Sequence, residues 1–171
     1  MHVKRPPFGV RYKVVNKRQL LKFIAEAHKA GYAAGEAANK VKEQDGSTTL
    51  TYGKGSWKYH DNYFGGEPFG GREVAFFENK PVWMMVYWGR VNESVKDFEA
   101  VYTFLRKALK LVPEEAPYRG PKEFTDGQFK YTNAWKGSVG GFSGKESIYQ
   151  NQEKVYETRY IGGFVDLRKE D

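Results

Sequence analysis

The sequence predicts an α+β fold made of two internally duplicated helix-plus-three-strand units, which form an antiparallel sheet with the helices packed on one face. Three observations support this prediction. Two segments carry apolar residues at helical spacing, seven have the aromatic and β-branched composition of strands, and residues 57–89 recur at residues 129–162. A chain of 171 residues fits a single domain, residues 1–171, with pseudo-repeat halves at about 8–91 and 92–165.

The first predicted half starts with a strand over residues 8–15 and a helix over residues 17–31, which Asn16 caps and Gly31 ends. Residues 32–55 are small, polar and dotted with glycine, so we expect a long connection or a flexible flap. Within this connection only residues 47–52 are typical of a strand. Three strands follow, at residues 57–64, 72–78 and 81–91.

The second predicted half starts with a helix that Ser94 caps, with Asp97 three residues later, and that ends before Pro113. Residues 111–121 contain three prolines and predict a loop. Three more strands are expected, at residues 127–135, 145–150 and 154–165.

The internal repeat is carried by short matching strings. Trp57-Lys58-Tyr59 recurs 72 positions later as Phe129-Lys130-Tyr131, and after one inserted residue the offset is 73. At that offset, Phe69-Gly70-Gly71-Arg72-Glu73 matches Phe142-Ser143-Gly144-Lys145-Glu146. The alternative is that two antiparallel meanders rich in glycine and tyrosine look alike without a duplication.

Side chains alternate between the two faces of a strand, so the pattern separates a core face from an opposite face. Tyr156, Thr158 and Tyr160 are expected in the core, as are Trp83, Met85 and Tyr87. The opposite face then carries a surface for a small molecule or a protein partner, with the residues Met84, Val86, Trp88, Glu157 and Arg159. The alternative is a central strand buried on both sides, under residues 32–55 or in a homodimer.

Several strings carry a resemblance to a known family. They are Lys58 to Gly66 with Phe69-Gly70-Gly71-Arg72-Glu73, Lys80 to Met85, and Val112-Pro113-Glu114-Glu115-Ala116-Pro117-Tyr118-Arg119-Gly120-Pro121. Over about Leu20 to Phe164 the chain resembles a family of bacterial and archaeal domains of unknown function, found alone or C-terminal to a Cro/repressor-type helix-turn-helix. The family pattern points to the positions Tyr59, Asp61, Tyr63, Gly65, Gly66, Phe69, Gly71 and Glu73.

The resemblance implies a sensing or effector-binding role. Only about 16 residues precede the first predicted helix, too few for a helix-turn-helix in this chain. Any regulatory role would therefore need a partner. We expect an uncharacterised domain that binds a small molecule or a protein partner, with a sensing or regulatory function.

An enzyme is the first alternative. Glu73 and Glu146 are equivalent in the repeat, and two carboxylates in one cleft can divide into acid and base roles. The other interpretation is that each carboxylate caps its own glycine turn. The sequence contains no Ser-His-acid constellation, phosphate loop or dinucleotide fingerprint, so the reaction stays open.

The composition argues against metals and cofactors. Cysteine is absent, and the three histidines, His2, His28 and His60, are scattered without a ligand-like spacing. We therefore predict no metal site and no cofactor.

Nucleic-acid binding is the second alternative, because the net charge is +7 and aromatic residues make up 16% of the chain. The candidate residues are Tyr59, Tyr63, Tyr131 and Trp135 with Lys58 and Lys130. Neighbours such as Lys58 and Tyr59 point to opposite faces of a strand, which weakens this interpretation. No apolar run approaches the roughly 20 residues that span a membrane, and no secretory signal is evident, so we expect a cytoplasmic protein without membrane contact.

Overall fold

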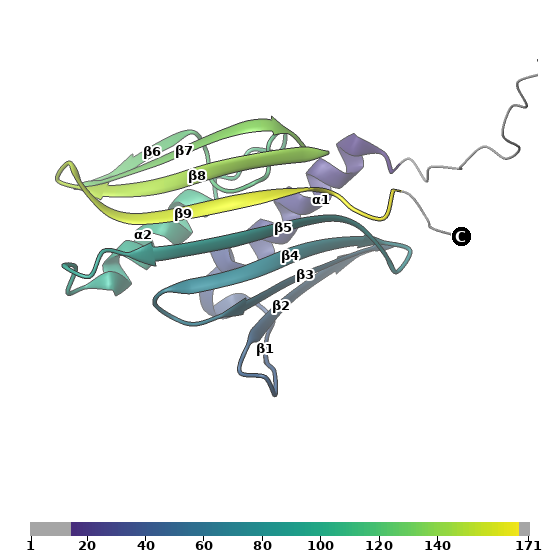
Figure 1. Ribbon diagram of the computed structural model, residues 1–171, viewed down its shortest axis with the longest axis horizontal. Helices are drawn as coiled ribbons and strands as arrows, with labels where there is room; N and C mark the ends of the chain where they lie inside the picture. Colours follow the sequence, from purple (N-terminus) through teal and green to yellow (C-terminus); the bar gives the residue numbers. More distant parts are fainter. Residues whose placement is uncertain (1–14, 168–171) are drawn as a thin grey trace, which may run out of the picture.

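Residues 15–167 of the computed structural model are described, and they form one nine-stranded antiparallel sheet with two α-helices and a short 3-10 helix (Figure 1). The helices are α1 (Lys17–Ala30), η1 (Tyr32–Ala37) and α2 (Phe98–Leu109). The strands are β1 (Lys40–Lys42), β2 (Thr48–Lys54), β3 (Trp57–Phe64), β4 (Phe69–Phe77), β5 (Lys80–Val91), β6 (Glu123–Asp126), β7 (Phe129–Ser138), β8 (Gly141–Gln150) and β9 (Glu153–Phe164). Their order across the sheet is β1-β2-β3-β4-β5-β9-β8-β7-β6.

The predicted fold class is wrong. The described chain is mostly one long antiparallel sheet, and it is not built from helix-plus-three-strand units. Strands β1 and β6 were not predicted from the sequence. All three residues of β1 and three of the four residues of β6 are exposed. Such short edge strands are held by pairing with β2 and β7 and carry no alternating apolar pattern. The strand predicted over residues 8–15 lies outside the described residues except for Val15, which is in no strand.

The centre of the sheet is the antiparallel pair β5 and β9, in which Tyr87 lies opposite Tyr160. The predicted alternation of core and outward residues is confirmed in both strands. The buried residues are Trp83, Met85, Tyr87, Tyr156, Thr158 and Tyr160. We call the face that bears them the inner face and the opposite one the outer face.

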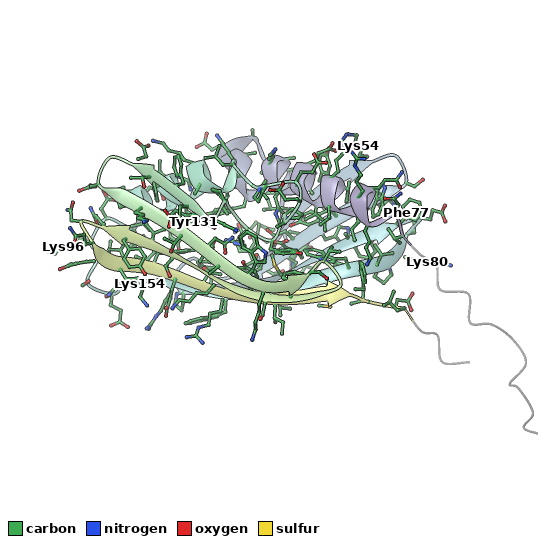
Figure 2. The ribbon with its side chains drawn as sticks, turned by 90° about the horizontal axis from the view of Figure 1, so that it is seen from above. Lys54, Phe77, Lys80, Lys96, Tyr131 and Lys154 are labelled. Atoms are coloured by element: carbon green, nitrogen blue, oxygen red, sulfur yellow. The ribbon has the colours of Figure 1, made fainter. Side chains whose placement is uncertain are left out.

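Helix α1 begins as predicted, because the Asn16 side chain accepts a hydrogen bond from the Gln19 N–H. Its apolar stripe, with Leu20, Phe23 and Ile24, packs on inner-face residues of the first half of the sheet. Figure 2 shows both α-helices on one side of the sheet, so the inner face is covered, and within residues 15–167 the outer face carries no helix.

The N-cap of helix α2 lies three residues after the predicted one. Asp97 is the true N-cap, since its carboxylate accepts a hydrogen bond from the Ala100 N–H at 3.1 Å. Ser94 lies in a preceding turn, where its N–H and hydroxyl both donate to Asn92. The helix packs on a second core that includes Tyr131, Ile148 and Tyr156.

The predicted loop after α2 is not a surface connection. Val112, Tyr118 and Arg119 are buried, and the Tyr118 ring stacks on Phe142 with centroids 3.9 Å apart. The loop therefore carries a guanidinium group into the space between the helices and the sheet. Within residues 15–167, neither helix has the length and apolar character to cross a bilayer.

Candidate functional site

A cleft of about 420 Å³ opens between helix α2, η1 and the inner face of the sheet. This volume lies within the usual range of small-molecule sites, roughly 300–1,000 Å³. Its lining residues come from six parts of the chain: Tyr32, Lys42, Asp61, Tyr63, Gly65, Gly66, Glu67, Phe69, Tyr87, Phe98, Glu99, Tyr102, Leu105, Arg106 and Arg119.

The walls of the cleft are largely aromatic. Phe69 lies between Tyr87 and Tyr102, with ring centroids 6.2 and 6.1 Å apart. At the mouth, the Tyr102 hydroxyl donates to the carboxylate of Glu67, and burial together with this bond raises the pKa of Tyr102. Glu67 also accepts a hydrogen bond from the Val91 N–H at 2.7 Å, so the loop after β3 is fixed to both α2 and β5.

The floor of the cleft carries Asp61, whose side chain is only 6% exposed. The Tyr87 hydroxyl donates to Asp61 Oδ1 at 2.6 Å, and no other described residue forms a hydrogen bond with this carboxyl group. Asp61 lies directly opposite Glu73 in the β3–β4 pair. Burial and the charge of Glu73 raise the pKa of Asp61 to about 7.

Behind Asp61 a small chamber of about 20 Å³ is lined by His28, Tyr59, Glu73 and Arg119 as well. This volume has room for about one water molecule. His28 Nε2 and Glu73 Oε2 are 2.6 Å apart, and Arg119 Nη1 lies 4.0 Å from Glu73 Oε1. Within residues 15–167, no group of three or more His, Asp or Glu side chains is placed to hold a metal ion.

Arg119 connects the chamber to a second buried carboxylate, Glu146. The guanidinium donates to Glu146 Oε1 from Nε at 3.0 Å and from Nη2 at 2.6 Å. The hydroxyls of Tyr156 and Tyr131 donate to the same carboxylate at 2.8 and 2.6 Å. Glu146 is thus fully hydrogen-bonded and does not line the cleft. Arg119 does line it, and its Nη1 forms no hydrogen bond with any described residue.

At two positions of the family pattern, Gly65 and Gly71, the structure requires glycine for different reasons. Gly65 has a φ of +83°, which favours glycine, and forms the bend after β3. Gly71 lies on β4 between the tyrosines of the neighbouring strands, and a methyl group there would approach the Tyr87 hydroxyl to 2.6 Å. The bare backbone at Gly71 therefore lets Tyr87 reach across β4 to Asp61.

The structure gathers the family-pattern residues at this site. Seven of them line the cleft or the chamber: Tyr59, Asp61, Tyr63, Gly65, Gly66, Phe69 and Glu73. Glu73 and Glu146 both approach Arg119, but only Glu73 borders the chamber.

The predicted surface lies on the other side of the sheet. Val86 and Trp88 are exposed, Met84 is partly buried, and Arg159 points outward next to Trp88. Glu157 accepts salt bridges from Lys154 and Lys145, and these lower its pKa to about 2.

Sequence reasoning missed three important residues, His28, Tyr87 and Arg119. His28 meets Glu73 across 45 residues and Arg119 meets Glu146 across 27, so no local spacing reveals either contact. One signal was present for Arg119, because the Pro-Tyr-Arg-Gly-Pro string that contains it is part of the family resemblance.

The cleft lies in a domain that belongs to a class whose activity is not assigned. The sequence profile of the family described as Domain of unknown function (DUF5680) matches residues 61–165, more than half of the chain, and the chain belongs to this family. The family assignment agrees with the resemblance to an uncharacterised domain. No curated protein and no solved structure matches the chain.

Proposed function

We propose that this domain binds a small planar aromatic or heteroaromatic molecule in the cleft. The observation that carries the proposal is the convergence of seven family-pattern residues on one cleft and its adjoining chamber. They come from β3, β4 and the loop between these strands, and α2 closes the cleft from above.

The chemistry of the cleft supports a particular ligand class. Aromatic walls at Tyr63, Phe69 and Tyr102 favour a flat ring. On the floor, Asp61 offers an acceptor and Arg119 Nη1 offers a donor, both close to the Tyr87 ring. A ring that carries an adjacent donor and acceptor, such as a carboxamide or a cyclic amide, satisfies both groups.

We favour a sensing role, in which the domain responds to the ligand that it binds in the cleft. The resemblance to domains that follow a DNA-binding module supports this role. The enzyme alternative with Glu73 and Glu146 as paired acid and base receives less support. All the hydrogen bonds of Glu146 run to Arg119, Tyr131 and Tyr156, which is the pattern of a structural carboxylate.

The test compares benzamide, benzoate and benzamidine, which share one ring and differ in donors and acceptors. Benzamide offers both a donor and an acceptor. At about 10 mM benzamide and a Kd of about 1 mM, mass action adds about 1.4 kcal/mol, a rise in Tm of roughly 3–5 °C. We expect benzamide to give the largest rise of the three.

Gly66→Phe is the matching variant, because Gly66 lines the cleft and a Cβ atom added there would have no atom within 4 Å. Gly141→Phe is its control, since Gly141 has equal space but does not line the cleft. The benzamide shift should disappear in Gly66→Phe and persist in Gly141→Phe. An equal shift in both variants, or no shift in the wild type with any of the three probes, would overturn the proposal.

A further inference from the structure

The outer face of the sheet is a second surface that the cleft does not explain. Three large apolar side chains lie together on β5 and β9, with Val86 40%, Trp88 49% and Ile161 58% exposed. The register places Val86 opposite Ile161 and Trp88 opposite Arg159, so they form one continuous patch. Scattered exposed apolar residues need no explanation, but a contiguous patch is typical of a binding surface.

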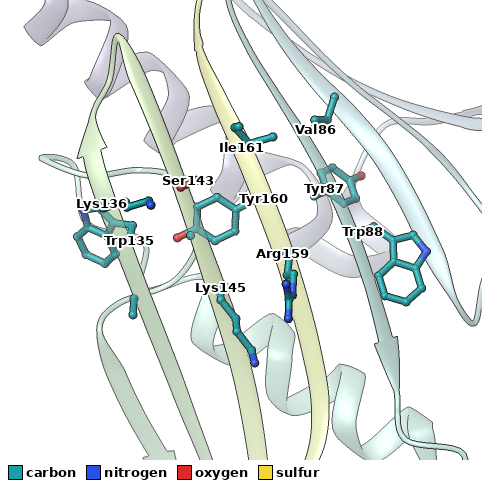
Figure 3. A pocket seen from close by; sticks show the side chains of 12 residues that line it. Val86, Tyr87, Trp88, Trp135, Lys136, Ser143, Lys145, Arg159, Tyr160 and Ile161 are labelled. Carbon is teal, nitrogen blue, oxygen red and sulfur yellow. The ribbon is translucent and has the colours of Figure 1, made fainter.

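Cations surround this patch. A shallow hollow of about 810 Å³ runs across β5, β9, β8 and β7 and is lined by Lys136, Lys145 and Arg159 together with Trp88, without any carboxylate (Figure 3). In Figure 3, Trp88, Arg159 and Lys145 lie in a row across three neighbouring strands, in agreement with the register.

Two more arginines extend the basic field. Arg72 lies opposite Val86 on β4, and Arg90 lies two residues beyond Trp88 on β5. Neither of them forms a salt bridge with any residue of the described chain, and the same holds for Arg159 and Lys136. The carboxylate of this area, Glu157, is already bound by Lys154 and Lys145. The patch therefore carries a surplus of unpaired positive charge.

The indole ring of Trp88 packs against the backbone of the neighbouring strand β4. A methyl group at Gly70 would come within 3.3 Å of Trp88 Cδ1, so the ring rests on the bare backbone of β4. A ring held against the sheet and half exposed is a platform on which another flat ring can stack.

We propose that the outer face binds single-stranded nucleic acid, with Trp88 stacking on a base and the surrounding arginines and lysines contacting phosphates. Neighbouring strands are about 4.8 Å apart, so the four strand steps from Arg72 to Lys136 span about 19 Å. This length accommodates several nucleotides. A single strand fits better than a duplex, because only unpaired bases leave their faces free to stack on a protein ring.

This surface differs from the one the sequence predicted for nucleic acid. Tyr59, Tyr131 and Trp135 point to the inner face and belong to the core or pack against it. Lys58 and Lys130, on the same strands, are exposed. The aromatic and basic groups come together through Trp88, which was assigned to the small-molecule or partner surface.

The test is fluorescence anisotropy with a labelled oligothymidylate of about 12 nucleotides, titrated with the full chain at low and at raised salt. Trp88→Ala should weaken binding by about 10-fold, since stacking on one base is worth about 1–3 kcal/mol. Arg159→Ala should reduce the slope of log Kd against log salt by about one. Trp fluorescence should be quenched in the wild type and less so in Trp88→Ala.

The matched control is Arg18→Ala, which removes an equal charge from an exposed position on helix α1, on the opposite side of the sheet. It should leave affinity and salt slope unchanged, and benzamide binding should be normal in all three variants. The proposal fails if no binding is detected at low salt, or if Arg18→Ala weakens binding as much as Arg159→Ala. It also fails if Trp88→Ala binds as well as wild type, or if anionic phosphatidylserine vesicles bind while the oligonucleotide does not.

Discussion

At the scale of single residues, two buried carboxylates of this protein have opposite surroundings. Glu146 accepts bonds from Arg119 and two tyrosines and so has the partners that a buried charge requires. Asp61 has one tyrosine hydroxyl as its donor and faces a second carboxylate across the strand pair. Asp61 is therefore the group whose protonation changes near neutral pH.

The first prediction concerns Asp61→Asn and the pH dependence of stability. The folded state raises the pKa of Asp61 from 3.8 to about 7, so it holds this proton more tightly than the unfolded state. The resulting stabilisation is complete below about pH 4 and is lost as the pH rises through about 7. Asparagine stays neutral, so the variant should be more stable than wild type at about pH 8, by on the order of 2 kcal/mol.

Urea unfolding across this pH range measures the effect. Asp166 supplies the control, because it is exposed and has no hydrogen bond or ion pair with any described residue, so Asp166→Asn should follow the wild-type profile. If the wild-type and Asp61→Asn curves run parallel from about pH 4 to pH 8, the proposed state of Asp61 is incorrect.

At the scale of elements, α2 forms one wall of the cleft, and its first turn is capped by Asp97. Ser94 was predicted as the N-cap because a serine that is followed three residues later by an acidic residue resembles a capping box. In the structure Ser94 is used by the turn at Asn92, and Asp97 satisfies the Ala100 N–H. Both residues are good caps locally, and only the tertiary position of the helix decides between them.

The assignment of Asp97 as the N-cap and the assignment of Ser94 predict different effects of mutation on stability. Asp97→Ala should cost about 1 kcal/mol, the usual cost of losing an N-cap, and should weaken ligand binding because Phe98 and Glu99 line the cleft. Ser94→Ala should stay within about 0.5 kcal/mol of wild type. Chemical denaturation of the two variants distinguishes the caps, and a larger cost for Ser94→Ala would contradict the structure.

The elements that the sequence predicted correctly are those with a clear apolar pattern. Helix α1, strand β3 and the inward side chains of β5 and β9 all have one face buried by the core, so their period is visible. Strand β1 has no such face, and β6 turns only Phe124 toward the core, so neither strand shows a period in the sequence. The loop that carries Arg119 inward was predicted as a loop, but its burial was not, because prolines indicate a turn and not its depth.

At the scale of the whole molecule, one curved sheet separates two different environments. Its inner face holds the aromatic core, the buried charges and the cleft, and its outer face holds Trp88 within a basic field (Figures 2 and 3). Strand alternation predicted this separation of faces from sequence. It could not predict the cleft, because Arg119 and helix α2 reach the floor and the wall from parts of the chain far from β3.

The central claim, that the cleft is the ligand site, is tested most directly by a two-dimensional amide NMR titration with benzamide. We expect concentration-dependent shifts at the amides of Tyr63, Gly66 and Tyr102, and none at Trp88 or Arg159 on the outer face. Gly66→Phe should abolish the shifts at Tyr63 and Tyr102. Shifts confined to the outer face, or no shift up to about 20 mM, well above the Kd of about 1 mM assumed for a fragment, would contradict it.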